Sequence, residues 1–225
     1  MPDSRPVEVL VFDVNETLSD MSVMSQRFAD VGADGRLAPT WFAGLLRDGI
    51  ALAATGSSEK FATIARESLH VLLGGLSLGM ETDKAADHVL EGFAGLDVHP
   101  DVSAGVRALS KAGLRLVTLS NGAAGVAEGL LSRAGVRDSF ESLLSVEEAG
   151  IWKPAAASYE YAARKCGVSP DRMMLVAVHP WDIDGAARAG MQTAWVSRGG
   201  GRYPAYFRAP DRTATGIDDL AGQLT

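Results

Sequence analysis

The segment VEVLVFDVNETL, residues 7–18, decides the fold prediction. Its first six residues, Val7–Phe12, are a short and mostly apolar run with β-branched side chains, which is typical of a strand buried on both faces of a parallel sheet. The run ends at Asp13. Because ligands of open parallel sheets bind at the carboxyl ends of the strands, the residues directly after this run are candidates for chemistry.

The same apolar pattern recurs four times later in the chain, and helical patterns lie between the recurrences. Further strands are expected at Leu114–Leu119, Leu143–Val146, Met173–Val178 and Thr193–Val196. Helices are expected at Val102–Ala112, Ala123–Ala134, Ala155–Cys166 and Ile183–Ala189. A glycine follows each helical pattern, as at a helix C-terminus: Gly113, Gly135, Gly167 and Gly190. The alternation predicts an α/β fold with a doubly wound, Rossmann-like parallel sheet.

Residues 22–96 differ from the rest of the chain because they contain no convincing strand. Helical patterns cover Val23–Val31, Thr40–Ala54, Ser57–Leu73 and Lys84–Phe93, and the last has Thr82 or Asp83 as a candidate N-cap. Aromatic and leucine side chains recur in them at helical spacing and are expected to be mostly core. We therefore predict an α/β core of residues 1–20 and 97–225, with a helical cap of residues 21–96 inserted after the first strand.

Composition excludes several classes of protein. The 225 residues are 47% hydrophobic and 22% charged, with a net charge of −7, so we expect neither a nucleic acid nor an acidic membrane as partner. Cys166 is the single cysteine, which excludes an internal disulfide and a thiolate-rich zinc site. No apolar run reaches the ~18 residues of a membrane helix. A cytoplasmic location is expected.

Polar residues follow the predicted strands at the points where the strands end. Asp13, Asn15 and Thr17 follow the first strand, and Ser120-Asn121-Gly122 follow the second. Lys153-Pro154 and Tyr159 come after the third, and His179-Pro180-Trp181-Asp182 after the fourth. Two carboxylates, a lysine, a Ser-Asn pair and a histidine are therefore expected at one edge of the sheet, with the inserted helices above them.

Four motifs at these strand ends resemble those of the haloacid dehalogenase superfamily, in the same order. They are VFDVNETL (residues 11–18), LSNG (119–122), Lys153-Pro154 and HPWDIDGA (179–186). SNG after the second strand, Tyr159 six residues after Lys153, and Trp-Asp after the fourth strand resemble the (S)-2-haloacid dehalogenases. The resemblance implies hydrolysis of small 2-haloacids to 2-hydroxy acids through an aspartyl ester, without cofactor or metal ion. It also implies a homodimer.

A Mg²⁺-dependent phosphatase of the same superfamily is the first alternative. A phosphatase needs a general acid two residues after its nucleophilic Asp, and acidic ligands for Mg²⁺. This chain has Asn15 and Ala177 at the corresponding positions, and neither can supply these functions. A halide leaving group needs no proton. The second alternative is a superfamily member that binds a small carboxylate without dehalogenating it.

The resemblance implies four catalytic residues. Asp13 is the expected nucleophile, and Lys153 pairs with it and holds it ionised. Asp182 positions or activates the water that hydrolyses the ester, and Thr17 hydrogen-bonds near the nucleophile. Each has a structural alternative: Asp13 as a turn cap, Lys153 as a surface lysine, and Asp182 as the N-cap of the following helix.

The resemblance also implies a substrate site. Ser120 and Asn121, with the backbone N–H groups after the first strand at Val14, are expected to receive the substrate carboxylate. Ser120 as a helix N-cap is nearly as good an interpretation. Further lining side chains are expected to be Tyr159, His179 and Trp181, and Tyr159 has a packed aromatic as its alternative. His179 introduces a titratable group, and its neutral imidazole could accept a hydrogen bond from water.

One departure from the family pattern concerns the cap. The dehalogenases place an arginine where this chain has Ala43. Arg47 lies one helical turn later, so its guanidinium is a candidate to reach the same pocket. The alternative is a solvated surface arginine beside Asp48.

Overall fold

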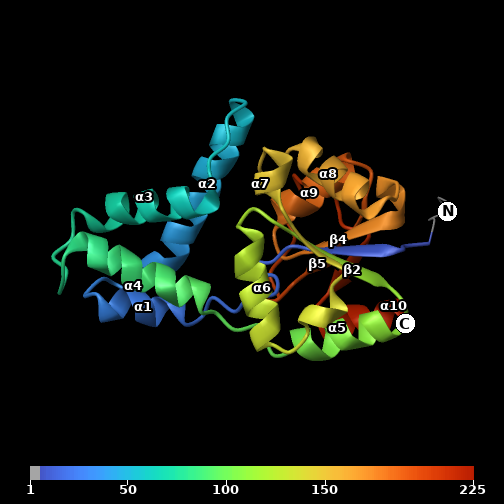
Figure 1. Cartoon of the computed structure of the whole chain (residues 1–225), viewed down its shortest axis with the longest axis horizontal. Helices are drawn as coiled ribbons and strands as arrows, with labels where there is room; N and C mark the ends of the chain where they lie inside the picture. The colour runs from blue at the N-terminus through green and yellow to red at the C-terminus, as the bar shows by residue number, and fades with distance from the viewer. Residues whose placement is uncertain (1–5) are drawn as a thin grey trace.

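The computed structural model describes residues 6–225, which form two lobes (Figure 1). One lobe contains a six-stranded parallel sheet in the order β3-β2-β1-β4-β5-β6. The strands are β1 (Val9–Phe12), β2 (Arg115–Ser120), β3 (Ser142–Ser145), β4 (Met173–Ala177), β5 (Gln192–Val196) and β6 (Arg212–Ala214). The helices of this lobe are α5 (Val102–Lys111), α6 (Ala124–Arg133), α7 (Val146–Ala149), α8 (Ala156–Cys166), α9 (Pro180–Arg188) and α10 (Ile217–Leu224). The predicted doubly wound α/β fold is confirmed.

The side chains of β1 alternate between the two faces of the sheet, and both faces are covered. Val9 and Val11 belong to the apolar cluster that includes α8 and α9, whereas Leu10 and Phe12 belong to the cluster with α5, α6 and α10. Figure 1 shows α8 and α9 on one side of the sheet and α5 and α10 on the other. All four side chains are fully buried, which explains why the strand is apolar throughout.

The second lobe consists of α1 (Met24–Asp30), α2 (Leu37–Ala54), α3 (Phe61–Leu73) and α4 (Thr82–Ala94). Its centre is an aromatic cluster with ring centroids 5.5 to 6.5 Å apart, made by Phe28, Trp41, Phe42, Phe61 and Phe93. Edge-to-face and offset ring contacts of this kind add stability beyond the burial of apolar area. Within residues 6–225, no helix combines the length and the hydropathy needed to cross a membrane.

Trp152 joins the two lobes. Its ring stacks on Phe61 of α3 at 5.8 Å with an interplanar angle of 13°, and its Nε1 donates to the carbonyl oxygen of Glu59 at 2.8 Å. α2 reaches the same ring at Gly49, where a Cβ atom would overlap Trp152. Because Trp152 precedes Lys153 in the chain, the helical lobe packs directly against the segment that carries the predicted catalytic lysine.

The chain enters and leaves the helical lobe at one place. Ser19 and Val98 form an antiparallel bridge, and the backbone N–H of Asp20 donates to the carbonyl oxygen of Asp97 at 2.8 Å. The two connections between the lobes therefore lie side by side.

Several element boundaries differ from the sequence predictions. α2 begins at Leu37 rather than Thr40, so Pro39 lies in its first turn. A proline is tolerated there because the backbone N–H that it lacks would have no partner within the helix. α3 begins at Phe61 rather than Ser57. Neither Thr82 nor Asp83 is an N-cap, since α4 starts at Thr82 after Glu81. β6 and α10 were not predicted. The four predicted C-terminal glycines do have φ between +63° and +88°.

We expect Gly49→Ala to lower the free energy of unfolding by about 1–3 kcal/mol, since the added methyl group must displace the Trp152 ring in a packed contact. Gly44→Ala on the same helix is the matched control, because no atom lies near its Cβ position, and it should stabilise by about 0.5–1 kcal/mol. Urea unfolding of both variants measures the difference, and equal effects would contradict the packing described here.

Candidate active site

Side chains from the ends of β1, β2 and β4 meet at the carboxyl edge of the sheet, around Asp13. Asp13 directly follows β1, which lies between β2 and β4. The hydroxyl of Thr17 donates to Asp13 Oδ2 at 2.7 Å and accepts the backbone N–H of Val178 at 3.1 Å. Arg198 donates to the carbonyl oxygen of Thr17, its Nη2 at 2.6 Å. The loop after β1 is thus tied to the loops after β4 and β5.

Lys153 is fully buried and bridges two carboxylates. Its Nζ donates to Asp13 Oδ1 at 2.9 Å and to Asp182 Oδ2 at 2.6 Å. Burial lowers the pKa of Lys153, but the charges of Asp13 and Asp182 outweigh it and leave the pKa raised. The ammonium group is therefore positively charged at neutral pH. Surface exposure, the structural alternative for Lys153, is wrong, since its side chain is 0% exposed.

Asp13 is held ionised although it is buried. Burial raises its pKa, but the charge of Lys153 and the hydrogen bond from His179 outweigh this and leave the pKa well below its usual range. An ionised carboxylate with little access to water is a better nucleophile than a hydrated one, since its lone pairs are not all bound to solvent.

Asp182 lies beyond Lys153, on the first turn of α9, and Tyr159 of α8 donates to its Oδ1 at 2.6 Å. Burial raises the pKa of Asp182, and burial also raises the pKa of Tyr159 well above its usual value. The N-cap of α9 is His179 and not Asp182. Tyr159 is completely buried and contacts Asp182 rather than an open pocket, so it orients the carboxylate.

His179 contacts the predicted nucleophile directly. Its Nδ1 lies 3.1 Å from Asp13 Oδ2 and its Nε2 lies 2.8 Å from Glu16 Oε2, while its ring stacks on Trp181 at 5.0 Å. Burial lowers the pKa of His179, but the hydrogen bonds and charges of Asp13 and Glu16 raise it to about 9. This pKa favours the imidazolium at neutral pH, in which both nitrogens donate, whereas acceptance of a hydrogen bond by a neutral imidazole stays a prediction.

Asn121 carries an unused donor at this edge of the sheet. Its Oδ1 accepts the backbone N–H of Lys153 at 2.9 Å, whereas its Nδ2 is buried and has no hydrogen-bond partner among residues 6–225. A buried N–H group without a partner is costly, which points to a ligand that completes it. Ser120 Oγ accepts the N–H of Gly122 at 2.9 Å, and the N-cap of α6 is Ala123, so Ser120 is no helix cap.

Two predicted substrate residues do not bring their side chains to Asp13. The side chain of Val14 lies in the apolar core, so only its backbone can serve the site. Arg47 is exposed and its Nε donates to Asp48 at 2.8 Å. Ala43 and Arg47 do share a face of α2, but that face is exposed, while Trp41 and Leu45 turn inward. The structural alternative for Arg47 is correct.

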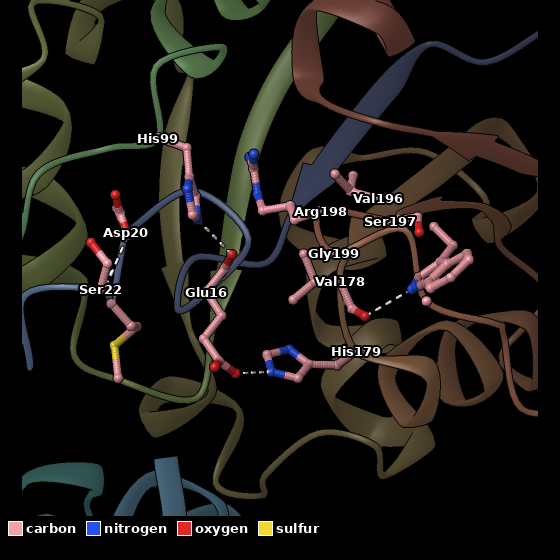
Figure 2. A pocket seen from close by; sticks show the side chains of 13 residues that line it. Glu16, Asp20, Ser22, His99, Val178, His179, Val196, Ser197, Arg198 and Gly199 are labelled. Atoms are coloured by element: carbon pink, nitrogen blue, oxygen red, sulfur yellow. Dashed lines mark hydrogen bonds and ion pairs between the residues drawn. The ribbon is translucent and has the colours of Figure 1, made fainter. Parts of the chain in front are cut away.

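A cavity of about 510 Å³ opens beside His179 and was not expected from the sequence. Figure 2 shows Glu16 and His179 at one end of it, joined by their ion pair, with His99 and Arg198 at the other end. Glu16 was also missed as a site residue, although it belongs to the first motif. The cavity gives the His179–Glu16 pair contact with solvent.

The residues around Asp13 do not fit a divalent metal ion. Both Asp13 oxygens already accept hydrogen bonds, from Lys153 on one side and from Thr17 and His179 on the other. Two cationic groups beside the carboxylate would repel a further cation. Within the described part of the chain, residues 6–225, no three His, Cys, Asp or Glu side chains are grouped so that they could hold a metal ion.

Two characterised proteins are similar to this chain over nearly its whole length. Haloacetate dehalogenase H-2 of Moraxella sp. (strain B) is 27% identical over 220 residues, which covers 96% of this chain and 97% of that protein. (S)-2-haloacid dehalogenase H-109 of Pseudomonas putida is 27% identical over 223 residues, covering 98% and 99%.

A solved structure shares the fold. L-2-haloacid dehalogenase of Xanthobacter autotrophicus is 26% identical and superposes with a TM-score of 0.86, covering 97% of this chain and 98% of that one. The same dehalogenase is also known with chloropropionic acid covalently bound. The family model for haloacid dehalogenase-like hydrolases matches residues 7–190. With its parallel sheet, its helical insertion and its Asp-Lys-Asp centre, this chain belongs to the haloacid dehalogenase-like hydrolase family.

Proposed function

We propose that this hydrolase converts small (S)-2-haloacids to 2-hydroxy acids and halide without a cofactor. Its strongest support is the state of Asp13, a buried carboxylate kept ionised by Lys153 at 2.9 Å. The characterised relatives are named for haloacetate and for (S)-2-haloacids, which supports the same substrate class. The covalently bound chloropropionic acid of the Xanthobacter enzyme supports a covalent route.

The proposed reaction has two steps. The Asp13 carboxylate attacks the α-carbon from the side opposite the halogen, the carbon–halogen bond breaks with its electron pair on the halide, and the carbon is inverted. Water then attacks the carboxyl carbon of the Asp13 ester, with Asp182 as the base that takes its proton. The ester bond breaks at that carbon, and the product leaves with an oxygen that belonged to Asp13.

The proposed position of the substrate depends on the free Nδ2 donor of Asn121 and on the helical lobe. Asn121 Nδ2 has no hydrogen-bond partner among residues 6–225, and we propose that it donates to the substrate carboxylate. We also propose that Ser120 and the backbone N–H at Val14 contribute to this site. We also propose residues 1–20 and 97–225 as the catalytic core and residues 21–96 as a cap. The contact of Phe61 with Trp152, the residue before Lys153, supports a cap that excludes water from the site.

The origin of the product oxygen tests the covalent step. In a single turnover with excess enzyme in ¹⁸O-labelled water, the product hydroxyl should be unlabelled and the label should enter Asp13. Mass spectrometry of the product and of the peptide with Asp13 measures both. Label in the product after the first turnover means that water attacks the carbon directly, and the ester route is then wrong.

Substrate class and metal dependence are tested together. Halide release from 2-chloropropionate should persist after EDTA treatment, because Lys153 and His179 supply the positive charge near Asp13. Phosphate release from a generic phosphate ester is the comparison. Mg²⁺-stimulated phosphate release would favour a phosphatase, and binding of 2-chloropropionate without release of halide would favour a carboxylate-binding protein.

Asn121→Ala should lower kcat/KM for 2-chloropropionate by about 10- to 100-fold, chiefly through KM, because a hydrogen bond to a charged group is lost. Arg47→Ala is the matched control, and its kcat/KM should stay within about twofold since Arg47 is exposed and pairs with Asp48. Steady-state kinetics measure both. A large loss in the Arg47 variant would place that side chain in the site after all.

A further inference from the structure

Glu16, His179 and Asp13 form a hydrogen-bonded chain, and the two proposed steps assign no role to Glu16 or His179. His179 lies between the two carboxylates, 3.1 Å from Asp13 Oδ2 and 2.8 Å from Glu16 Oε2, and Figure 2 shows its contact with Glu16. The side chain of His179 is 11% exposed and that of Glu16 is 40% exposed, so the chain runs from the buried Asp13 toward solvent.

The backbone at Glu16 indicates that its carboxylate is used. Glu16 has φ of +61° and is the only non-glycine residue with positive φ among residues 6–225. Glycine adopts this conformation without steric cost, whereas another L-residue costs about 1–2 kcal/mol. The loop is held there by the carbonyl oxygen of Glu16, which contacts His99 Nε2 at 3.1 Å. A glutamate at this position offsets the backbone cost through its ion pair with His179.

The two oxygens of Asp13 differ in their free lone pairs. Oδ2 accepts from Thr17 at 2.7 Å and from His179 at 3.1 Å, whereas Oδ1 accepts only from Lys153 among residues 6–225. Because a carboxylate oxygen has two lone pairs, Oδ2 is saturated and Oδ1 has one pair free. Oδ1 is therefore the attacking atom, and Oδ2 becomes the carbonyl oxygen of the ester.

We propose that His179 and Thr17 form an oxyanion hole at Asp13 Oδ2 for hydrolysis of the ester, with Glu16 as the positioning residue that holds the His179 ring there. This inference rests on the proposed function. When water adds to the carboxyl carbon, the carbonyl electron pair moves onto Oδ2, where both donors already point. The pair returns as the bond to Oδ1 breaks, the product alkoxide takes the proton held by Asp182, and the regenerated carboxyl group loses its proton to water.

Glu16 matters most once the ester has formed. Esterification removes the charge of Asp13, and Glu16 is then the carboxylate that remains in contact with His179. The other groups facing His179 are the Trp181 ring, Lys153 behind Asp13, and Asp20, His99 and Arg198 across the cavity. Lys153 and Arg198 are cations and disfavour the imidazolium, so loss of Glu16 leaves it without a carboxylate in contact, and Asp20 is the anion across the cavity.

The expected pH dependence of ester hydrolysis follows from the raised pKa of His179. The pKa of His179 is raised to about 9 in the free enzyme, so the imidazolium is present below that pH and is lost as the pH rises through it. In the ester the pKa is lower because the charge of Asp13 is gone. Hydrolysis of the ester should therefore fall on the alkaline side, at or below about pH 9.

The test separates the two steps in single turnovers of 2-chloropropionate with excess enzyme. Halide release reports ester formation, and appearance of the 2-hydroxy acid reports ester hydrolysis. In His179→Asn, ester hydrolysis should slow about 100-fold, as for loss of one oxyanion-hole donor, and should slow more than halide release does. The ester should accumulate, visible as an intact-protein mass increase, and the alkaline limb of hydrolysis should disappear.

Two Glu16 variants separate charge from backbone strain. Glu16→Gln should shift the alkaline limb of hydrolysis to lower pH by about one unit, since one neighbouring anion is removed. Glu16→Gly should shift it likewise, although it relieves the backbone strain, because it also removes the carboxylate. His70→Asn, a histidine on α3 beside Asp83, is the control that should leave both steps unchanged.

Three results would overturn the inference. Hydrolysis at the wild-type rate in His179→Asn would remove the oxyanion role, and slower halide release with unchanged hydrolysis would assign His179 to the first step. An unmoved alkaline limb in both Glu16 variants would remove the positioning role. If the wild-type enzyme binds 2-chloropropionate but releases no halide and forms no ester, the proposed function fails and this inference fails with it. If halide is released and the ester hydrolyses normally in the variants, the inference alone is refuted.

Discussion

The ammonium group of Lys153, buried between the carboxylates of Asp13 and Asp182, is the interaction on which the site depends. Two buried carboxylates this close to one another do not both stay ionised unless a cation lies between them. The fold supplies that cation from a third segment: Asp13 follows β1, Asp182 lies in α9, and Lys153 follows α7. Trp152 anchors the lysine segment to the helical lobe, so the charge at the centre of the sheet edge depends on packing contributed by both lobes.

The charged groups form one alternating series: Asp182, Lys153, Asp13, His179 and Glu16. Every member has a neighbour of opposite sign within 3.1 Å, which offsets the cost of desolvating buried charges. Asp13 is the central member. In the proposed ester the series divides into two neutral pairs, Lys153 with Asp182 and His179 with Glu16. Neither cation of the series would then lack an anion in contact with it.

Strand ends could be predicted from the sequence because a strand that is buried on both faces needs apolar side chains throughout. Val9–Phe12 is such a run, and Asp13 marks where it ends. β6 has no such run, since two of its three residues are exposed. Glu16 could not be found because its role depends on a left-handed backbone conformation and on a partner 163 residues away. The helical spacing of Ala43 and Arg47 was informative about their common face, but only tertiary packing decides that this face is exposed.

The antiparallel bridge between Ser19 and Val98 has a consequence for how this architecture can change. Because the chain leaves the sheet and returns to it at a single point, the helical lobe is connected to the sheet in the same way as one surface loop. The intervening helices can change in length or sequence without altering strand order or register, provided that the contacts of Phe61 and Gly49 with Trp152 remain. The helical lobe and the sheet can therefore diverge at different rates, and that one contact is the constraint that they share.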